Sequence, residues 1–342
     1  MLVASQPALI LAPMEGVTDA PMRALLSQLY PFAFCVTEFL RVSQDVIPDF
    51  VFQRHIPELE TQCKTASHCP IVVQLLGGDP VKLAQSALVA VTLGAKAIDI
   101  NFGCPAPTVN RHDGGATLLK YPERILTILA TLRSALPRDV SLSAKVRLGW
   151  ENKTDIFKIA EAVEMGGASW ITIHGRTKVQ GYAPPADWEI IGKVKQQLKI
   201  PVVANGDVDS LEAFKRCRDL TECIHFMIGR GALSDPNLAN EIAFELGIAS
   251  ANPYPWDRNA IGDWIPQLRE FERLCVPHAT NPGYTIRRIK QWMNISNRKQ
   301  PLPWFNQIKQ MSNTEELWKW CESFYSCDSS IHLYSQNHYS GN

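Results

Sequence analysis

The segment AIDINFGCP, residues 97–105, is informative about the fold, because it joins a short strand-like run to a turn that carries a thiol. Its first five residues form an apolar run, and Cys104 follows between a glycine and a proline. Apolar runs of this length are typical of strands buried on both faces of a parallel sheet. The segment therefore predicts a parallel strand whose carboxyl end leads into a loop with a candidate reactive group.

Similar runs recur along the chain, with amphipathic helical patterns between most of them. The expected strands cover residues 8–13, 32–38, 71–76, 97–101, 143–148, 170–175, 201–206 and 224–231. The helical patterns cover residues 80–93, 123–136, 155–164, 188–198 and 211–218. Eight alternations in about 230 residues fit an α/β fold of the TIM (β/α)8 barrel type better than a doubly wound sheet.

The pattern changes near Phe244, after which the strand-like runs stop and only helical patterns follow, at residues 264–275, 286–295 and 314–324. We therefore predict a barrel domain at residues 1–243 and an all-helical domain at residues 244–325. Residues 326–342 are rich in Ser, His, Tyr and Asn, which predicts a disordered tail.

Composition limits the classes of partner. The 342 residues carry 34 basic and 34 acidic side chains, so only a local cluster could attract nucleic acid. No run is long and apolar enough to span a bilayer, and the N-terminus lacks the basic start of a secretory signal. The nine cysteines are irregularly spaced without a Cys-x-x-Cys pair, which argues against disulfides and structural zinc. We expect a cytoplasmic protein with no metal and no membrane partner.

Active sites of TIM barrels lie at the carboxyl ends of the strands, so polar residues there are candidates. Lysine is rarely buried without a partner or a function, which makes Lys145 the strongest candidate. A lone cysteine is usually core filler and a strand-end histidine is often structural, so both roles stay open for Cys104 and His174. The residues that end the expected strands are Pro13, Met14, Glu15, Glu38, Gln74, Asn101, Cys104, Lys145, Arg147, His174, Arg176, Asn205, Asp207, Gly229, Arg230 and Gly231.

Two glycine-containing turns follow the seventh and eighth expected strands, at residues 205–207 and 229–231. In this fold those loops often bind phosphate through backbone N–H groups, and Arg230 would add charge. A phosphorylated ring cofactor such as FMN fits the arrangement, with Lys145 stabilising the negative charge of the reduced ring. Cys104 would then donate a proton during hydride transfer.

Eight motifs together resemble the tRNA-dihydrouridine synthase family, from about Leu9 to Leu238. They are LAPMEGVTD, VQLLG, DINFGCPAPTV, GGATLL, KVRLGW, IHGRTKVQGY, PVVANGDV and MIGRGAL. The resemblance implies a flavoprotein barrel followed by a helical RNA-binding domain. It also implies reduction of the C5–C6 double bond of uridine in tRNA, with FMN as cofactor and NADPH (or NADH) as reductant.

The resemblance implies roles for individual positions. Cys104 would protonate uracil C5 while the flavin delivers hydride to C6, and Asn101 and Arg147 would hold the base flipped out of the tRNA. The implied flavin-binding positions are Pro13, Met14, Glu15, Gln74, Lys145, His174, Asn205, Gly206, Asp207, Gly229 and Arg230. Asp207 stands where a glutamate is common in the bacterial branch of the family that modifies uridine 16.

The motifs TEFLRV, KVRLGW, GRTKVQGY and RIKQW resemble the bacterial branch of the family that modifies uridine 16. This implies tRNA contacts at Arg41, Tyr182, Arg288 and Lys290, although Ile295 stands where the branch predicts a tyrosine. Residues 284–299 contain five basic residues and no acidic one. Such a run is often only a solvated face, but with the resemblance it indicates a phosphate-contacting surface.

Two other classes of function remain open from the sequence. A small-molecule flavin enzyme of the dihydroorotate dehydrogenase kind would share the barrel, the FMN and the pyrimidine chemistry, but would not need a basic helical extension. A non-catalytic RNA-binding module would not need Cys104, Lys145 and His174 together. No obligate protein partner is evident, so we expect a monomer.

Overall fold

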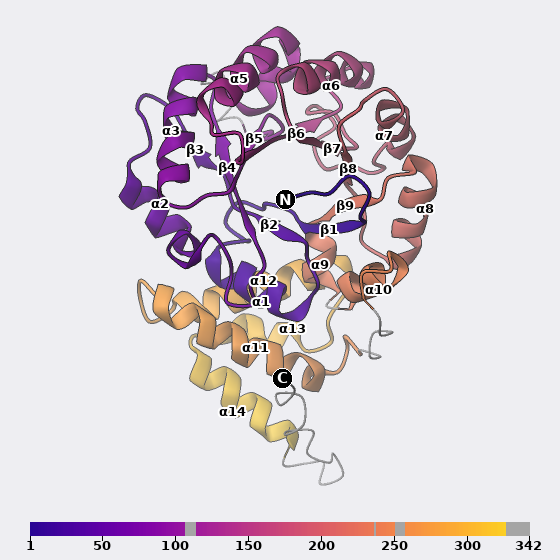
Figure 1. The fold of residues 1–342 in the computed structure, drawn as a ribbon. Helices are drawn as coiled ribbons and strands as arrows, with labels where there is room; N and C mark the ends of the chain where they lie inside the picture. Colours follow the sequence, from indigo (N-terminus) through magenta and orange to yellow (C-terminus); the bar gives the residue numbers. More distant parts are fainter. Residues whose placement is uncertain (107–113, 236, 250–256, 326–342) are drawn as a thin grey trace. The chain divides into compact units, whose positions relative to one another are not determined.

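The structure is a computed structural model that describes residues 1–106, 114–235, 237–249 and 257–325. Within these ranges nine short strands, all paired in parallel, form one sheet around a common centre (Figure 1). They are β1 (Ala8–Leu11), β2 (Phe34–Val36), β3 (Leu40–Arg41), β4 (Ile71–Leu76), β5 (Ala97–Asn101), β6 (Ser141–Arg147), β7 (Trp170–His174), β8 (Val202–Asn205) and β9 (His225–Ile228).

The sheet closes into an eight-membered ring. β1 pairs with both β2 and β9, β2 pairs with β4, and β4 to β9 pair in chain order. The two-residue β3 pairs with the end of β4 and so continues the position of β2 after a short break. The predicted TIM barrel is therefore confirmed. The second expected strand, residues 32–38, is shortened to β2, and β3 lies beyond its expected end.

Helices surround the barrel, as expected for strand–helix alternation (Figure 1). They are α1 (Ala20–Leu29), α2 (Asp49–His55), α3 (Pro80–Thr92), α5 (Pro122–Ala135), α6 (Ile156–Met165), α7 (Trp188–Lys195), α8 (Leu211–Thr221), α9 (Arg230–Ser234) and α10 (Leu238–Glu245), with the 3₁₀ helices η1 (Pro57–Thr61), η2 (Gly115–Lys120) and η3 (Lys153–Asp155). Several begin at polar caps that accept backbone N–H bonds. The caps are Asp19 for α1, Asp79 for α3, Asp187 for α7 and Ser210 for α8.

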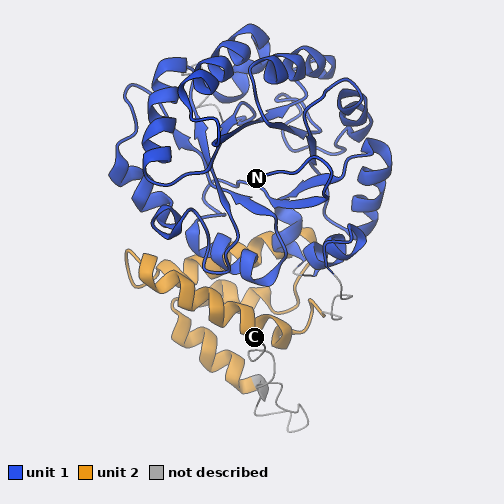
Figure 2. Cartoon of the chain, in the orientation of Figure 1, with its two compact units in different colours: residues 1–256 blue, residues 257–342 orange. Residues whose placement is uncertain are grey.

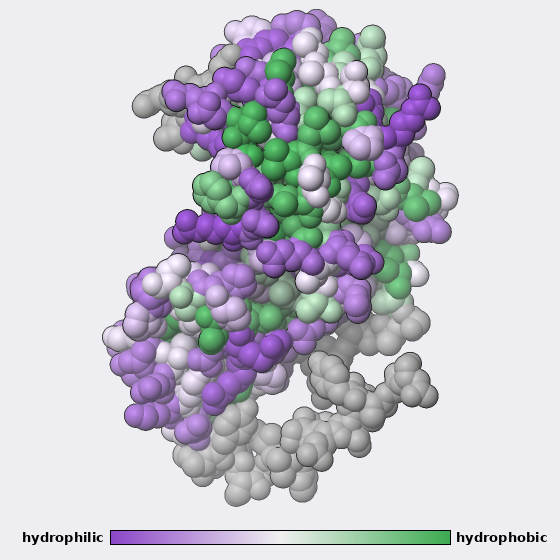
Figure 3. Space-filling model, turned by 60° about the vertical axis from the view of Figure 1, so that its left-hand side comes forward, coloured by the Kyte–Doolittle hydropathy of each residue, from purple (hydrophilic) through white to green (hydrophobic). Residues whose placement is uncertain are grey.

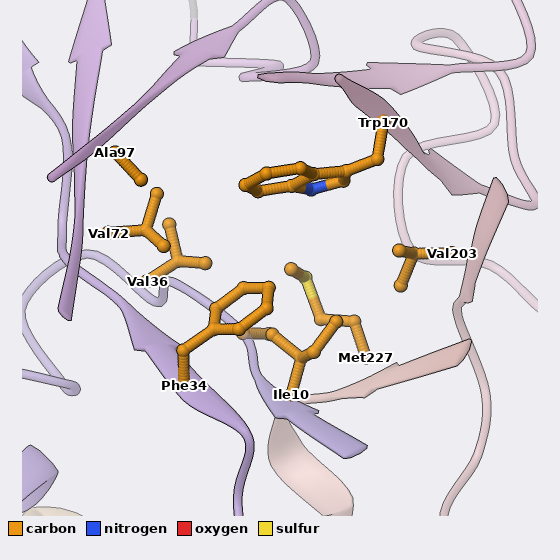
Figure 4. Packing of buried hydrophobic residues seen from close by; sticks show 9 residues of the cluster. Ile10, Phe34, Val36, Val72, Ala97, Trp170, Val203 and Met227 are labelled. Carbon is orange, nitrogen blue, oxygen red and sulfur yellow. The ribbon is translucent and has the colours of Figure 1, made fainter. Parts of the chain in front are cut away.

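The interior of the barrel contains an apolar cluster, and polar residues lie beyond it at the carboxyl ends of β4 to β8. Ile10, Phe34, Trp170 and Met227 belong to a buried cluster inside the ring (Figure 4). Side chains alternate with a period of two, so Trp170 and His174 on β7 point to the same side of the strand. An apolar plug therefore fills the amino-terminal part of the barrel and leaves polar groups at its carboxyl-terminal mouth.

The outer surface of the barrel unit is not uniformly polar. Figure 3 brings forward the side that carries α2 and α3, where apolar residues lie among polar ones. Phe50 on α2 is 66% exposed, and Val81 on α3 is 57% exposed. Apolar side chains thus occur on the outer helices of the barrel as well as in its core.

The second unit is helical, as predicted. It contains α11 (Ile261–Cys275), η4 (Val276–His278), α12 (Tyr284–Lys299), α13 (Phe305–Gln310) and α14 (Thr314–Tyr325). Trp264 packs edge-on against Trp292 and Trp304, with ring centroids 5.7 Å and 5.8 Å away. Phe271 contacts Trp292 at 5.5 Å, so the tryptophans of α11 and α12 form the core of this unit.

The two compact units divide between Trp256 and Asp257 (Figure 2). The boundary expected at 243/244 falls inside α10, a helix that contacts α8, α9 and β1 and so belongs to the barrel unit. The expected tail at 326–342 lies outside the described residues. Within the described ranges, every helix is too short or too polar to cross a membrane.

Candidate functional site

Strand register brings the predicted polar residues together at the carboxyl-terminal mouth of the barrel. Gln74 pairs with Asp99 across β4 and β5, and Asn101 pairs with Lys145 across β5 and β6. The series continues where Arg147 pairs with His174, and His174 with Asn205. Five consecutive strands thus supply neighbouring polar side chains to one rim, in keeping with the rule for this fold.

A chain of buried hydrogen bonds crosses three of these strands. The Asp99 carboxylate accepts a bond from Ser143 Oγ at 2.6 Å and another from Gln74 Nε2 at 2.7 Å. Gln74 Oε1 accepts from Asn101 Nδ2 at 2.9 Å. Asn101 Oδ1 then accepts from the backbone N–H of Gly103 at 2.9 Å. The network therefore fixes the orientation of the Gln74 and Asn101 side-chain amides. It also holds Gly103, the residue before Cys104, in place.

Asp99 belongs to this network, although the sequence reasoning did not single it out as a candidate. It is 2% exposed, and burial raises its pKa to about 6, although the bonds from Ser143 and Gln74 and the charge of Lys145 oppose the rise. The signal in the sequence is a carboxylate between two isoleucines in an otherwise apolar strand. Charged groups are rarely buried there without partners.

Lys145 lies on β6 opposite Asn101, close enough to the network for its charge to interact with Asp99. Burial lowers its pKa to about 8, with the neighbouring Arg147 acting in the same direction and Asp99 opposing the decrease. The ammonium group therefore stays charged at neutral pH but binds its proton less tightly than an exposed lysine. Such a group can stabilise negative charge that develops on a bound molecule at the mouth.

Cys104 lies just beyond β5 and is half-buried. Burial raises the pKa of its thiol, so the group is protonated at neutral pH. Its backbone carbonyl accepts a bond from Ala116 N at 3.1 Å, and the preceding Gly103 is held through both its N–H and its carbonyl. The open question about Cys104 thus narrows, because its thiol is half-buried at the rim and keeps its proton at neutral pH, unlike a fully buried core residue that solvent cannot reach.

Arg147 joins two loops at the mouth. Its Nε donates to the Gly103 carbonyl at 2.9 Å, and its Nη1 donates to the carbonyls of Thr177 at 3.1 Å and Gly181 at 2.8 Å. Its guanidinium carbon also lies 5.3 Å from the ring centroid of Tyr182, and that of Arg230 lies 5.2 Å from the same ring. Tyr182 is 59% exposed, so two cations flank an aromatic ring that faces solvent.

His174 and Asp207 occupy the rim on β7 and after β8. Burial lowers the pKa of His174 well below its ordinary value, as do the surrounding cations, so the ring is neutral at pH 7. Its Nδ1 is buried and has no hydrogen-bond partner among the described residues. Asp207 instead pairs with Arg176 and accepts from Ala186 N at 2.9 Å. Its carboxylate therefore braces the loop and is engaged within the protein.

The loop after β1 is built on its own backbone. Met14 N donates to Thr18 Oγ1 at 2.8 Å, and Val17 N donates to Glu38 at 3.1 Å. Burial raises the pKa of Glu38 to about 7. A Cβ added to Gly229 would lie 3.2 Å from the Met14 sulfur, so this glycine lets the loops after β1 and β9 approach closely. Pro13 and Met14 are half-buried, whereas Glu15 is exposed.

These residues fit a flavin. The buried His174 Nδ1 and Arg176 Nη1 have no hydrogen-bond partner among the described residues, and Lys145 supplies a cation. Asn205 Nδ2 donates to the Met227 carbonyl at 2.8 Å and holds β8 against β9 below the two glycine-containing turns. Arg230 is exposed at the start of α9, and its guanidinium adds positive charge to the mouth. The mouth thus offers unpaired polar groups and positive charge to a polar, anionic ring compound.

The expected tRNA contacts are distributed unevenly. Arg41 is exposed on β3, and Lys290 is half-buried on α12. Arg288 is only 9% exposed, donates to Gln291 and lies over the Phe271 ring, within the helical unit. Ile295 is half-buried on the same helix. Of the basic run, Arg287 and Lys290 therefore present more charge to solvent than Arg288 does.

Comparisons with known proteins agree with this geometry. Three curated relatives are named tRNA-dihydrouridine(16) synthase. The one from Neisseria meningitidis serogroup A is 42% identical over 314 residues, covering 90% of this chain and 92% of that protein. The one from Shewanella oneidensis is 42% identical over 310 residues, with 90% and 95% covered. The one from Pseudomonas syringae pv. tomato is 42% identical over 294 residues, with 85% and 90% covered.

Solved structures of distant sequence share the barrel. A 2-naphthoyl-CoA reductase superposes with a TM-score of 0.54 at 12% identity, covering 72% of this chain and 51% of that one. Histamine dehydrogenase from Rhizobium sp. 4-9 gives 0.52 at 14% identity, with 72% and 47% covered. The family model described as dihydrouridine synthase (Dus) matches residues 10–325. Dihydrouridine synthases use a flavin to reduce uridine in tRNA to dihydrouridine. With a match that spans both of its units, this chain belongs to the dihydrouridine synthase family.

Proposed function

We propose that this protein reduces the C5–C6 double bond of uridine 16 in tRNA, with FMN as its flavin and NADPH or NADH as the reductant. The position is supported by the names of its relatives, which specify uridine 16. The observation that carries the chemistry is the protonated Cys104 thiol, which is held beside Lys145, Arg147 and the Asp99 network at one barrel mouth.

Cys104 supplies the proton in this proposal. Reduction of the C5–C6 bond adds a hydride to C6 and a proton to C5, and the bound flavin supplies the hydride. Because burial raises the pKa of Cys104, the thiol holds its proton at neutral pH and can act as a general acid. Gly103 is fixed by Asn101 and Arg147, so the donor is held in place before the base arrives.

The flavin is proposed to lie across the mouth from the loop after β1 to the turn after β9. Lys145 and the neutral His174 face the ring. Gln74 forms hydrogen bonds with the ring through an amide group whose orientation is fixed by its bond to Asp99. The contacts proposed for the ring and phosphate are Pro13, Met14, Glu15, Asn205, Gly206, Gly229 and Arg230. Asp207 acts indirectly, since its carboxylate is engaged by Arg176 and Ala186.

The base is proposed to enter from the side of Tyr182. A uridine must leave the tRNA fold to reach the flavin, and an exposed aromatic ring between two guanidinium groups suits that passage. Asn101 and Arg147 would hold the base, and Arg41 and Lys290 would contact the backbone. Arg288 would act by holding Gln291, given that it is 9% exposed.

We propose that the protein acts in the cytoplasm and as a monomer. The eight cysteines within the described residues are all free thiols, which is typical of a reducing compartment. Dihydrouridine should therefore be mapped by position in tRNA from a strain that lacks this gene, with and without the gene restored. Loss confined to position 16 and recovered on restoration is the expected result. Loss at another position would refute the uridine-16 assignment, and turnover of free pyrimidines without any tRNA product would refute the RNA substrate.

A further inference from the structure

Three loops at the barrel mouth meet around one tryptophan. Lys120 ends η2 on the loop that follows β5, Trp150 lies after β6, and Lys178 lies after β7. The Lys120 ammonium lies 3.9 Å from the Trp150 ring centroid, and the Lys178 ammonium lies 4.2 Å from it. We refer to these three residues as the rim cluster. Because the three loops follow consecutive strands of the barrel, the rim cluster shares its end of the fold with Cys104.

The backbone around the rim cluster is held firmly. Lys178 N donates to the Gly149 carbonyl at 2.9 Å, and Val179 N donates to the Trp150 carbonyl at 2.9 Å. A Cβ on Gly149 would lie 2.3 Å from the Asn152 carbonyl oxygen, so the tight turn beside Trp150 requires glycine. The loops that carry Trp150 and Lys178 are therefore joined by backbone bonds, and this fixes where the Lys178 side chain begins.

The charge of the rim cluster is not balanced locally. Among the described residues, neither Lys120 nor Lys178 forms an ion pair, and the exposed Glu151 next to Trp150 pairs with neither. The nearby Lys153 is already paired with Asp187 at 2.6 Å. Placing two ammonium groups on one ring concentrates positive charge on the rim of a chain whose formal net charge is zero. An anion that approaches both lysines would relieve their repulsion.

The rim cluster also borders the catalytic loops. Lys178 directly follows Thr177, whose carbonyl accepts the 3.1 Å bond from Arg147. Lys120 is exposed, and Lys178 and Trp150 are half-buried, so the ammonium groups keep contact with solvent. A polyanion whose reactive base enters the mouth would pass its backbone over this rim.

We propose that the rim cluster is a phosphate-binding site for the backbone of the RNA substrate, with Lys120 and Lys178 as the contacts and Trp150 as the ring that fixes them. This rests on the proposed function and extends it to residues outside the flavin and base pockets. Trp150 acts through cation–π attraction, which limits the conformers of two otherwise flexible side chains. The occupant is RNA phosphate and not the phosphate of a nicotinamide reductant.

The test compares the affinity for unmodified tRNA over a series of salt concentrations. The logarithm of the association constant falls linearly with the logarithm of the salt concentration. For Lys120→Ala with Lys178→Ala, this slope should become less steep by about 0.7 to 0.9 for each phosphate that a lysine no longer contacts. The matched control is Lys96→Ala with Lys199→Ala, which removes the same charge from exposed lysines that precede β5 and β8 at the opposite end of the barrel. The control should keep the wild-type slope. Equal slopes for wild type and the Lys120/Lys178 variant would overturn the proposal.

Two further readouts separate the causes. Trp150→Phe keeps an aromatic face and should show nearly the wild-type salt dependence of tRNA affinity, whereas Trp150→Leu should show a weaker one. The same salt dependence for both variants would show that the ring does not take part in the site. The KM for NADPH should be unchanged in the Lys120/Lys178 variant, because a raised KM with intact tRNA binding would assign the rim cluster to the reductant. Wild-type reduction of uridine 16 is measured alongside, so that failure of the proposed function is seen separately.

Discussion

Asp99→Asn gives the sharpest test of the electrostatics at the mouth. In the folded protein burial raises the pKa of Asp99 to about 6, from an ordinary value of 3.8. A carboxyl with a raised folded pKa binds its proton more tightly in the native state, so it stabilises the fold at low pH and loses that contribution as pH rises through 6. Asparagine has no such proton, and the variant should lack this part of the pH dependence.

The magnitude follows from the difference between the two pKa values, which is about 2 units at about 1.4 kcal/mol per unit. Between pH 4 and pH 7 the free energy of unfolding of the wild type should fall by about 2 to 3 kcal/mol relative to the variant. Lys145, with a pKa of about 8, stays charged throughout this range. Other groups titrate in both proteins and cancel in the comparison.

The substitution should preserve the hydrogen bonds, which makes it a clean test. An asparagine oxygen can still accept from Gln74, and its NH₂ can donate to Ser143, whose hydroxyl can accept as well as donate. Urea unfolding of both proteins at pH 4, 5, 6 and 7 measures the difference. A difference in unfolding free energy that is the same at every pH would refute the conclusion that burial outweighs the two bonds. Asp99→Leu is the contrasting variant, and it should be less stable than Asp99→Asn by about 2 to 6 kcal/mol at every pH, because two buried donors lose their acceptor.

Three other changes have clear expected outcomes. Cys104→Ala should keep the flavin absorbance and the tRNA affinity but lose at least about 100-fold in uridine reduction, and undiminished turnover would contradict its role as acid. Arg23→Met should lower the free energy of unfolding by about 3 to 5 kcal/mol, because it leaves Glu58 buried without its 2.8 Å partner. Adding Glu58→Leu should restore much of the loss in the same urea assay, and no restoration would argue against the ion pair as the cause. Gly149→Ala should cost about 1 to 3 kcal/mol, because its Cβ would lie 2.3 Å from a backbone oxygen. Gly262→Ala meets nothing within 4 Å and is the control, so equal urea midpoints for the two would refute the steric argument.

The sequence predicts the barrel well because its signals are local. Short apolar runs such as residues 71–76 and 97–101 form strands with the predicted bounds, because strands of a parallel sheet are buried on both faces and are therefore apolar along most of their length. The fold rule then places Cys104, Lys145 and His174 at one mouth without any knowledge of distances. Only residues 34–36 of the strand expected at 32–38 are extended in the sheet, and the two-residue strand β3 at 40–41 was not predicted, because so short a run gives no periodic signal.

The partners of buried polar groups could not be predicted in the same way. Asp99 meets Gln74 and Ser143, which lie 25 and 44 residues away, and Asp207 is engaged by Arg176, 31 residues away. Arg288 was expected to reach solvent as part of a basic run, yet it stands four residues before the buried Trp292 and so shares its helix face. The helical period of the sequence therefore indicated that Arg288 is buried, but the prediction followed the run of basic residues instead.

The Arg147 guanidinium allows the loops around it to change in sequence while they stay joined. The three hydrogen bonds that join it to the loops end on the backbone carbonyls of Gly103, Thr177 and Gly181. Every residue type provides such a carbonyl, so neighbouring loop positions can exchange side chains while the two loops stay joined. The surface that meets the substrate can therefore change its specificity over generations, provided that this arginine and the loop lengths are kept.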